Sequence, residues 1–208
     1  MASSWYKENG INLNDSVGID EVGRGSLVGP VVAAVVWLKD TAASSIGKEA
    51  LVVRDSKKMT QKQRKKVVAW MDEQPEYAVR YAHGTVQVEE IDQLNILRAS
   101  LLAMERAYAM LNLTVPHVLV DGNKAPAIPG VRTIIKGDSR VLTISLASII
   151  AKEHRDAIMH LLAAEYPDYG WETNVGYGSK RHLEAIRTHG VTPHHRKSFD
   201  PVRTLHLL

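Results

Sequence analysis

VGIDEVGRGSLVGPVVAAVVW, residues 17–37, is the stretch of the chain that decides the fold. It begins as an apolar strand that ends on two adjacent carboxylates, Asp20 and Glu21. A glycine-rich turn follows, and residues 30–37 then run almost unbroken through apolar, mostly β-branched side chains. Such a run is typical of a central strand that is covered on both faces. The stretch therefore predicts two strands, the second of them in the interior of a sheet.

The turn after the acidic pair carries Gly23, Arg24 and Gly25. Glycines let the backbone come close to a ligand, and an arginine offers a rigid fork of donors for phosphate or sugar oxygens. Asp20 and Glu21 supply the oxygen ligands that hard divalent cations prefer. Together these groups predict phosphodiester chemistry, although Arg24 is also placed to form a structural ion pair with Glu21.

The rest of the chain alternates strands with helices. Predicted strands cover residues 77–85, 117–122 and 131–136, and predicted helices cover 60–71, 94–111, 142–164 and 180–188. The helix over 142–164 is apolar nearly all round in its first half, which indicates burial. This order predicts an α/β fold with a mixed β-sheet flanked by helices. We expect it to occupy residues 1–165, with residues 166–208 forming a small C-terminal helical extension packed on it.

Composition sets limits on the class of protein. A chain of 208 residues with 45% hydrophobic content is typical of a globular domain, and the lack of cysteine excludes disulfides and thiolate zinc sites. Residues 1–14 lack the pattern of a secretory signal. The longest apolar run, residues 28–38, is far shorter than the ~20 residues of a membrane span. We expect a cytoplasmic protein without membrane contact, and a monomer.

Positive charge is concentrated in two segments although the net charge is only +3. Six Lys or Arg residues lie from Ser179 onward, against Glu184 and Asp200. A second cluster consists of Lys57, Lys58, Lys62, Arg64, Lys65 and Lys66. Basic segments on a near-neutral body favour binding to a nucleic-acid backbone. The alternative for the second cluster is a solvated helix face.

Two further acids, Asp121 and Asp138, follow the predicted strands over 117–122 and 131–136. Because ligands gather at strand ends in an α/β sheet, these acids can converge with Asp20 and Glu21. Two divalent ions about 3.5–4 Å apart would remove the repulsion among them. Without histidine or thiol ligands, Mg²⁺ or Mn²⁺ is favoured over zinc. Taken singly, Asp121 could belong to a turn, and Asp138 could cap the next helix.

Seven segments of the chain have the form of known motifs: GIDEVGRGSLVGPVVAA (18–34), DSKKMT (55–60), VDGN (120–123), KGDSR (136–140), ASIIAKEHRD (147–156), GYGSKRH (176–182) and TPHHRKSFDPV (192–202). In this order they resemble ribonuclease HII, the bacterial type 2 ribonuclease H. The resemblance covers nearly the whole chain, and the first segment with VDGN and KGDSR is its most specific part. It implies a ribonuclease H-like mixed sheet with helices on both faces.

The resemblance also implies roles for individual residues. The family's four catalytic, metal-binding acids match Asp20, Glu21, Asp121 and Asp138. Its ribonucleotide-reading segment and the tyrosine beside the ribonucleotide match Gly23, Arg24, Gly25 and Tyr177. Lys57 matches a lysine near substrate phosphate, and Asn95 is a further candidate for a phosphate contact.

The activity implied by this resemblance is endonucleolytic hydrolysis on the 5′ side of ribonucleotides, leaving 3′-hydroxyl and 5′-phosphate ends. The substrates would be RNA/DNA hybrids and duplex DNA with single embedded ribonucleotides, cut by two-metal-ion catalysis during replication and repair. Two alternatives are a resolvase-like metal nuclease of the same fold that acts on DNA, and a non-catalytic nucleic-acid-binding module.

Two sets of polar side chains in the C-terminal half of the chain have structural interpretations. Lys152 and Arg155 with Asp156 predict an ion pair on a helix face. His194 and His195 could suggest a metal site, but beside Arg196 they favour packing or a phosphate contact.

Overall fold

The fold is built on one mixed β-sheet. The computed structural model describes residues 4–48, 53 and 56–205. Within these residues, five strands pair in the order β3-β2-β1-β4-β5. Their bounds are β1 Ser16–Val22, β2 Val31–Leu38, β3 Val79–Val86, β4 His117–Asp121 and β5 Val131–Ile134. The strands predicted from the sequence are thereby confirmed, and so is the mixed α/β class.

The directions of the strands bring the acidic segments together. β1 pairs antiparallel with β2, and β2 pairs antiparallel with β3. In contrast, β1 pairs parallel with β4, and β4 pairs parallel with β5. The carboxyl ends of β1, β4 and β5 therefore share one edge of the sheet, so Asp20 and Glu21 end up on the same side as Asp121. Asp138 follows β5 on that side, in a short 3₁₀ turn, η3 (Gly137–Ser139).

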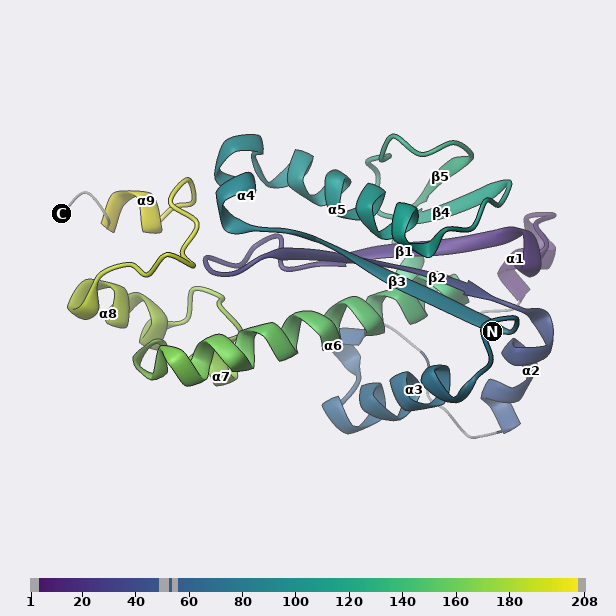
Figure 1. Cartoon of the computed structure of the whole chain (residues 1–208), viewed down its shortest axis with the longest axis horizontal. Coiled ribbons are helices and arrows are strands. Elements are labelled where there is room, and N and C mark those ends of the chain that lie inside the picture. The colour runs from purple at the N-terminus through teal and green to yellow at the C-terminus, as the bar shows by residue number, and fades with distance from the viewer. Residues whose placement is uncertain (1–3, 49–52, 54–55, 206–208) are drawn as a thin grey trace.

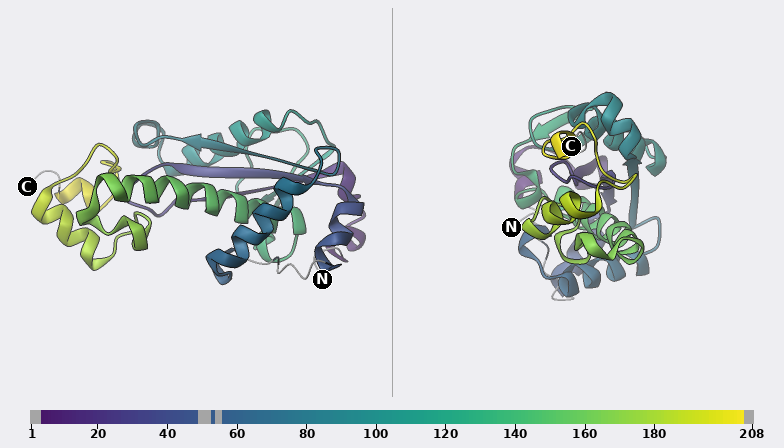
Figure 2. Two further views of the ribbon diagram at one scale, coloured as in Figure 1. Left: turned by 60° about the horizontal axis from the view of Figure 1, so that its bottom comes forward. Right: turned by 90° about the vertical axis from the view of Figure 1, so that its left-hand side faces the viewer.

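Helices cover both faces of the sheet, as Figures 1 and 2 show. The longer helices are α2 Asp40–Lys48, α3 Gln61–Glu73, α4 Val88–Leu94, α5 Ile96–Leu111, α6 Leu142–Glu165 and α8 Lys180–His189. The shorter ones are α1 Ser4–Glu8, α7 Trp171–Asn174 and α9 Val202–Leu205, with 3₁₀ turns η1 Leu13–Asp15, η2 Ser56–Lys58 and η4 Pro167–Tyr169. α5 packs on one face and α6 on the other.

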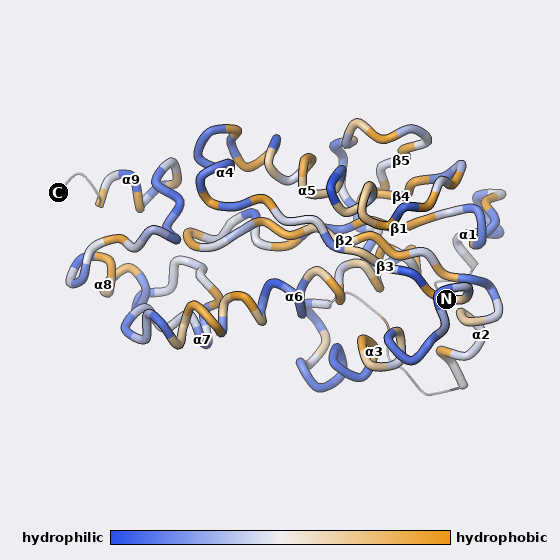
Figure 3. The backbone as a smooth tube through the Cα atoms, in the orientation of Figure 1, coloured by the Kyte–Doolittle hydropathy of each residue, from blue (hydrophilic) through white to orange (hydrophobic). Residues whose placement is uncertain are grey.

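Each face of the sheet has its own apolar core. Alternate side chains of β2 point to opposite sides, so Val32, Ala34 and Val36 join the core beneath α6. Val31, Ala33 and Val35 join the core beneath α5. Figure 3 shows the apolar positions following the strands and the inner faces of these helices. The first ten residues of α6, 142–151, are all buried, as its apolar sequence predicts.

Two helix predictions have different outcomes at their ends. The predicted capping box at Thr60 is confirmed: its side chain accepts a hydrogen bond from the Gln63 backbone N–H, and the Gln63 side chain accepts one from the Thr60 N–H. The helix predicted over 94–111 is confirmed as α5, which begins at Ile96, slightly later than predicted. Asn95 has φ +67°, and its carboxamide oxygen accepts hydrogen bonds from Leu97 N and Arg98 N, so it begins α5 as a separate helix.

The C-terminal elements form a third apolar cluster at one end of the molecule (Figure 1). Trp171, Ile186 and Val202 are buried there against Met159 of α6 and Leu27 of the loop after β1. Residues 166–205 thus pack on the body through α6 and this loop, and the division at residue 165 stays a prediction. None of the helices in the described ranges is both long enough and apolar enough to span a membrane.

Candidate active site

An open cleft of about 410 Å³ lies at the sheet edge where the acidic segments meet. Its lining residues come from five places in the chain: the end of β1 and its loop, η2, the end of β4, η3 and the loop before α8. They are Asp20, Glu21, Val22, Gly23, Arg24, Gly25, Lys57, Asp121, Asp138 and Tyr177. Every site residue predicted from the sequence, apart from Asn95, therefore lines one cleft.

Asp20 is the most deeply buried of the four acids, at 6% exposure. One carboxylate oxygen accepts a 2.7 Å hydrogen bond from the Glu21 backbone N–H. Burial, followed by the negative charges of Glu21 and Asp121, raises the pKa of Asp20 well above its usual value. This carboxylate is therefore costly to ionise unless positive charge is brought to it.

Glu21 has one satisfied and one unsatisfied carboxylate oxygen. Oε1 lies 3.2 Å from Nη1 of Arg24, which confirms the ion pair that the sequence allows. Oε2 is buried and accepts no hydrogen bond from any described residue. Burial raises the pKa of Glu21, and although Arg24 opposes this shift, Asp121 adds to it. A buried carboxylate oxygen without a donor is the kind of group that a cation satisfies.

Asp121 and Asp138 lie next to each other through the backbone. Oδ1 of Asp121 accepts hydrogen bonds from the backbone N–H groups of Gly137, at 2.6 Å, and Asp138, at 3.4 Å. The Ser145 hydroxyl on α6 donates to the Asp138 carbonyl at 2.5 Å. Asp138 thus lies in the turn before α6 and not at its N-cap, which is Val141. The helix-cap interpretation of Asp138 is wrong.

The donor set of the cleft fits a hard divalent cation. All four acids offer oxygen, and no histidine or cysteine lines the cleft. In the described part of the chain, no group of three or more His, Cys, Asp or Glu side chains is arranged to hold a metal ion. Mg²⁺ commonly takes one or two carboxylates and keeps waters or phosphate oxygens as its other ligands. An open cleft in which Glu21 Oε2 has no hydrogen-bond donor among the described residues suits this type of coordination.

Divalent cations are expected to stabilise the folded protein at neutral pH. Because Asp20 has a higher pKa in the folded state, folding retains a proton above about pH 4 that the unfolded chain releases. Stability therefore falls as pH rises from there through the raised pKa. At pH 8, 10 mM Mg²⁺ should raise the Tm by about 3 °C, and the gain should shrink towards pH 5. Thermal unfolding in NaCl of equal ionic strength is the control, and equal Tm values would contradict cation binding here.

In the same cleft, the loop after β1 and the loop before α8 lie close to each other. A Cβ on Gly25 would lie 3.8 Å from Cε1 of the Tyr177 ring. Tyr177 is 40% exposed, and the Arg24 side chain is about half exposed. The cleft therefore has an acidic wall and a second wall made of backbone, guanidinium and an aromatic ring.

The chain is similar to known proteins over most of its length. The family model of ribonuclease HII matches residues 17–202. The chain belongs to the ribonuclease HII family. Ribonuclease HII of Paramagnetospirillum magneticum is 47% identical over 186 residues, covering 89% of this chain and 90% of that protein.

Solved structures agree in fold. Ribonuclease H2 of Pyrococcus horikoshii superposes with a TM-score of 0.74 at 24% identity, covering 92% of this chain and 97% of the other. Bst-RNase HIII in complex with Mn²⁺ gives a TM-score of 0.71 at 19% identity, covering 93% and 70%. The fold is therefore that of the ribonucleases H. As a member of the ribonuclease HII family the protein is a metal-dependent endonuclease acting on nucleic acid, and the alternative of a non-catalytic binding module is excluded.

Two fully buried arginines fix the loop that lines the cleft, and sequence reasoning missed both roles. Arg196 donates from Nη1 to the Arg24 carbonyl at 3.1 Å and from Nε and Nη2 to the Gly29 carbonyl. The prediction that Arg155 joins an ion pair with Asp156 on a helix face is wrong. Arg155 points inward and donates to the carbonyls of residues 28, 30 and 175 and to the Ser26 hydroxyl. Both arginines fix the loop that carries Arg24.

The expected basic surface is smaller than the sequence suggests. Asp156 does pair with Lys152, at 2.7 Å, as predicted. Arg64 of the second basic cluster is buried and pairs with Glu153 at 2.5 Å and with Asp156 at 3.4 Å. Arg64 also donates to the Met59 carbonyl at 3.0 Å, which holds the turn that carries the cleft-lining Lys57.

Asn95 is the one predicted site residue that does not line the cleft. Its side chain is occupied in capping α5, and its proposed phosphate contact stays a prediction. A smaller hollow beside the cleft is instead lined by Leu97, Asn123 and Lys124 together with Glu21 and Asp121. Sequence reasoning did not single out Asn123 or Lys124, although Asn123 belongs to the VDGN segment.

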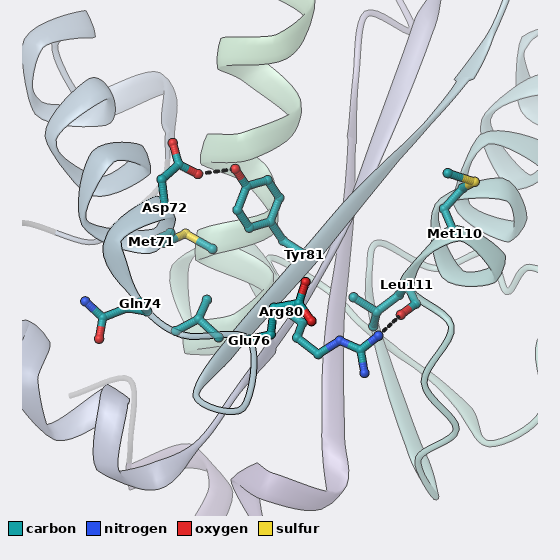
Figure 4. A pocket seen from close by; sticks show the side chains of 9 residues that line it. Met71, Asp72, Gln74, Glu76, Arg80, Tyr81, Met110 and Leu111 are labelled. Carbon is teal, nitrogen blue, oxygen red and sulfur yellow. Dashed lines mark hydrogen bonds between the residues drawn. The ribbon is translucent and has the colours of Figure 1, made fainter.

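Another cavity, of about 320 Å³, lies at the opposite end of the sheet, where β3 begins (Figure 4). Val79 pairs with Leu38 there, whereas Val22 at the acidic edge pairs with Val32. The Tyr81 hydroxyl donates to Asp72, and Arg80 donates to the Leu111 carbonyl at 2.7 Å. These bonds join β3 to α3 and α5, so we interpret the polar groups of this cavity as structural.

Proposed function

We propose that this protein hydrolyses the phosphodiester on the 5′ side of a ribonucleotide, leaving 3′-hydroxyl and 5′-phosphate ends. Its substrates are RNA/DNA hybrids and duplex DNA with single embedded ribonucleotides. The observation that supports this most directly is the cleft itself, because one cleft is lined both by the four acids and by Gly23, Arg24, Gly25 and Tyr177. An acidic wall for cleavage and a polar wall for a sugar are thus a single site.

The four acids are the groups proposed to hold two divalent cations, Mg²⁺ or Mn²⁺. Bound there, two such ions would activate the attacking water and stabilise the leaving oxygen. Burial raises the pKa values of Asp20 and Glu21, so a nearby cation would stabilise the ionised forms of these two carboxylates most. Asp121 is fixed by the Gly137 N–H, and this bond holds its carboxylate in one direction. The Mn²⁺ complex of Bst-RNase HIII, a protein of similar fold, supports the choice of metal.

The second wall offers a physical reason for recognising ribose. A 2′-hydroxyl both donates and accepts hydrogen bonds, and only ribose carries one. Gly25 leaves the backbone accessible beside the exposed Arg24, whose guanidinium can hold a phosphate bidentately. Tyr177 offers its ring to the neighbouring sugar. A deoxyribose would leave these polar groups without partners, which is a strong source of discrimination.

Lys57 extends the site towards a further phosphate, and the exposed lysines beside it, Lys58 and Lys62, favour contact with the duplex backbone. We further propose that the enzyme acts as a cytoplasmic monomer in replication and repair, where ribonucleotides must be removed from duplex DNA. These assignments rest on the charge distribution and on family membership.

Cleavage of matched duplexes tests the proposed function. We expect an all-DNA duplex to be cut about 10⁴-fold more slowly than the same duplex with one internal ribonucleotide, because the all-DNA substrate has no 2′-hydroxyl for the site to bind. An end label should place the cut directly 5′ of the ribose, and a long RNA/DNA hybrid should also be cut. Equal cleavage of all-DNA duplex would instead favour the resolvase-like alternative, and a cut on the 3′ side would contradict the proposed geometry.

A further inference from the structure

Two histidines that contribute nothing to the cleft surface are fully buried behind Tyr177. His182 lies in the first turn of α8, and His195 lies in the loop that follows α8. Both side chains have 0% exposure and contact each other, with 3.2 Å between their Nε2 atoms. Burying two imidazoles costs free energy unless each polar atom has a partner, so their hydrogen bonds identify what they do.

The surrounding donors determine the tautomer of His195. The backbone N–H of Thr192 donates to Nδ1 of His195 at 2.9 Å. A backbone N–H can only donate, so this Nδ1 carries no proton. Burial, together with the neighbouring His182, lowers the pKa of His195 to about 3, so the ring is neutral near pH 7. Its single proton is therefore on Nε2, and this N–H is directed at His182.

The tautomer of His182 follows by the same reasoning. The indole Nε1–H of Trp171, which can only donate, lies 3.0 Å from Nε2 of His182. The lone pair on this Nε2 is thus shared by two donors, Trp171 and His195. Burial lowers the pKa of His182 as well, which keeps the ring neutral. The proton of His182 is consequently on Nδ1, and Nδ1 lies 2.9 Å from the Tyr177 carbonyl oxygen.

We propose that His182 and His195, the histidine pair, are positioning residues that fix Tyr177 in the cleft through the His182 Nδ1–H bond to the Tyr177 carbonyl. The inference rests on the proposed role of Tyr177 beside the ribonucleotide. Every hydrogen bond in the pair then has one donor and one acceptor, and the bond that leaves the pair ends on Tyr177.

The Tyr177 N–H is held by the Asn174 carbonyl at 2.9 Å, and the histidine pair adds a support on the other side of the residue, at its carbonyl. Gly176 has φ +85° and Gly178 follows, so the backbone on both sides of Tyr177 is permissive. The ring is partly exposed to solvent and lines the cleft. The Tyr177 carbonyl accepts from Ser179 N at 2.8 Å and from His182, and these two bonds together orient the peptide that follows the ring.

The tautomers can be observed directly in the unmodified protein. A long-range ¹H–¹⁵N correlation spectrum at pH 7 should show His182 protonated on Nδ1 and His195 protonated on Nε2. The usual Nε2–H form of His182 would overturn the proposal, because that form has no proton to donate to Tyr177. This measurement does not depend on whether any variant folds.

Variants test whether the bond matters for cleavage. His182→Leu removes the donor and should lower kcat on a duplex with one embedded ribonucleotide by about 10-fold, with KM changed less than about twofold. His182→Asn should restore most of the activity, because its Nδ2–H₂ occupies nearly the position of Nδ1–H. His189→Leu, an exposed histidine at the end of the same helix, is the matched control and should behave as the parent. Thermal unfolding of each variant reports any loss of fold.

A double-variant cycle separates this inference from the proposed function. Tyr177→Ala should lower kcat on the same substrate, and adding His182→Leu to it should cause no further loss. If Tyr177→Ala is fully active, the proposed role of Tyr177 fails and the inference falls with it. If Tyr177→Ala is impaired while His182→Leu is as active as the parent, or if the two losses multiply, the positioning role alone is overturned.

Discussion

Asp121→Asn is expected to lower metal-dependent cleavage by about 10³-fold, a loss of about 4 kcal/mol of transition-state stabilisation. The loss is expected from the missing negative charge alone, because the hydrogen bond that orients the side chain can be kept. Oδ1 of Asp121 accepts the Gly137 N–H at 2.6 Å, and an asparagine oxygen can accept the same bond. The variant thus keeps the turn of η3 in place but removes one negative charge from the acidic wall.

The measurement is single-turnover cleavage of a duplex with one ribonucleotide, with binding of the same duplex measured in parallel. Binding should stay within about threefold of the parent, since the residues proposed to bind the substrate are left unchanged. Asp168→Asn is the matched control, because Asp168 is exposed in η4 and lies outside the cleft lining. A cleavage rate for Asp121→Asn within tenfold of the parent would exclude Asp121 from metal binding.

Much of this site could be predicted because its information is local. Asp20 and Glu21 end a run that can only be a buried strand, and Asp121 ends another. Parallel pairing of β1 with β4 then brings them to one edge, a pairing that the predicted mixed sheet allows but does not specify. The capping box at Thr60 is a similar case, because its two hydrogen bonds involve residues three apart.

What could not be predicted depends on tertiary contacts. Arg155 lies beside Asp156 in the sequence, so a surface ion pair is the economical interpretation, yet its donors satisfy carbonyls of residues far away in the chain. The exact start of α5 is a different case, because its signal is local. The apolar spacing begins at Leu94, but Leu94 ends α4, and Asn95, with its positive φ and its capping bonds, separates the two helices.

The other large effect expected from substitution concerns Gly23, which has φ +92° and lies against the buried Arg155. A Cβ at Gly23 would lie 2.2 Å from Arg155 Nε and 2.7 Å from its Cδ, far inside contact distance. Arg155 has no room to yield, because it is fully buried and holds its four acceptors in place. We therefore expect Gly23→Ala to destabilise the protein by about 3 kcal/mol, combining backbone strain with this overlap.

Substitutions at two other glycines of the cleft region distinguish backbone strain from the steric overlap with Arg155. Gly122 has φ +95°, but a methyl group there would have no neighbour within 4 Å, so Gly122→Ala should cost only the strain, about 1 kcal/mol. At Gly25 a methyl group would contact only the Tyr177 ring, at 3.8 Å. The free energy of unfolding of Gly25→Ala should therefore lie within about 0.5 kcal/mol of the parent value. Urea unfolding of the three variants gives the order. If Gly23→Ala is no less stable than Gly122→Ala, the overlap with Arg155 does not constrain this loop.

The same series links stability to cleavage. Any movement of Arg155 that relieves Gly23→Ala also disturbs its bond to the Val175 carbonyl, two residues before Tyr177. Gly23→Ala should therefore lose about 100-fold in kcat even at temperatures where it is fully folded. Gly25→Ala keeps its fold but places a methyl on the wall proposed to meet the sugar, so its loss should appear mainly with embedded ribonucleotides. Normal kcat in folded Gly23→Ala would mean that the loop after β1 reaches its working shape without the Arg155 support.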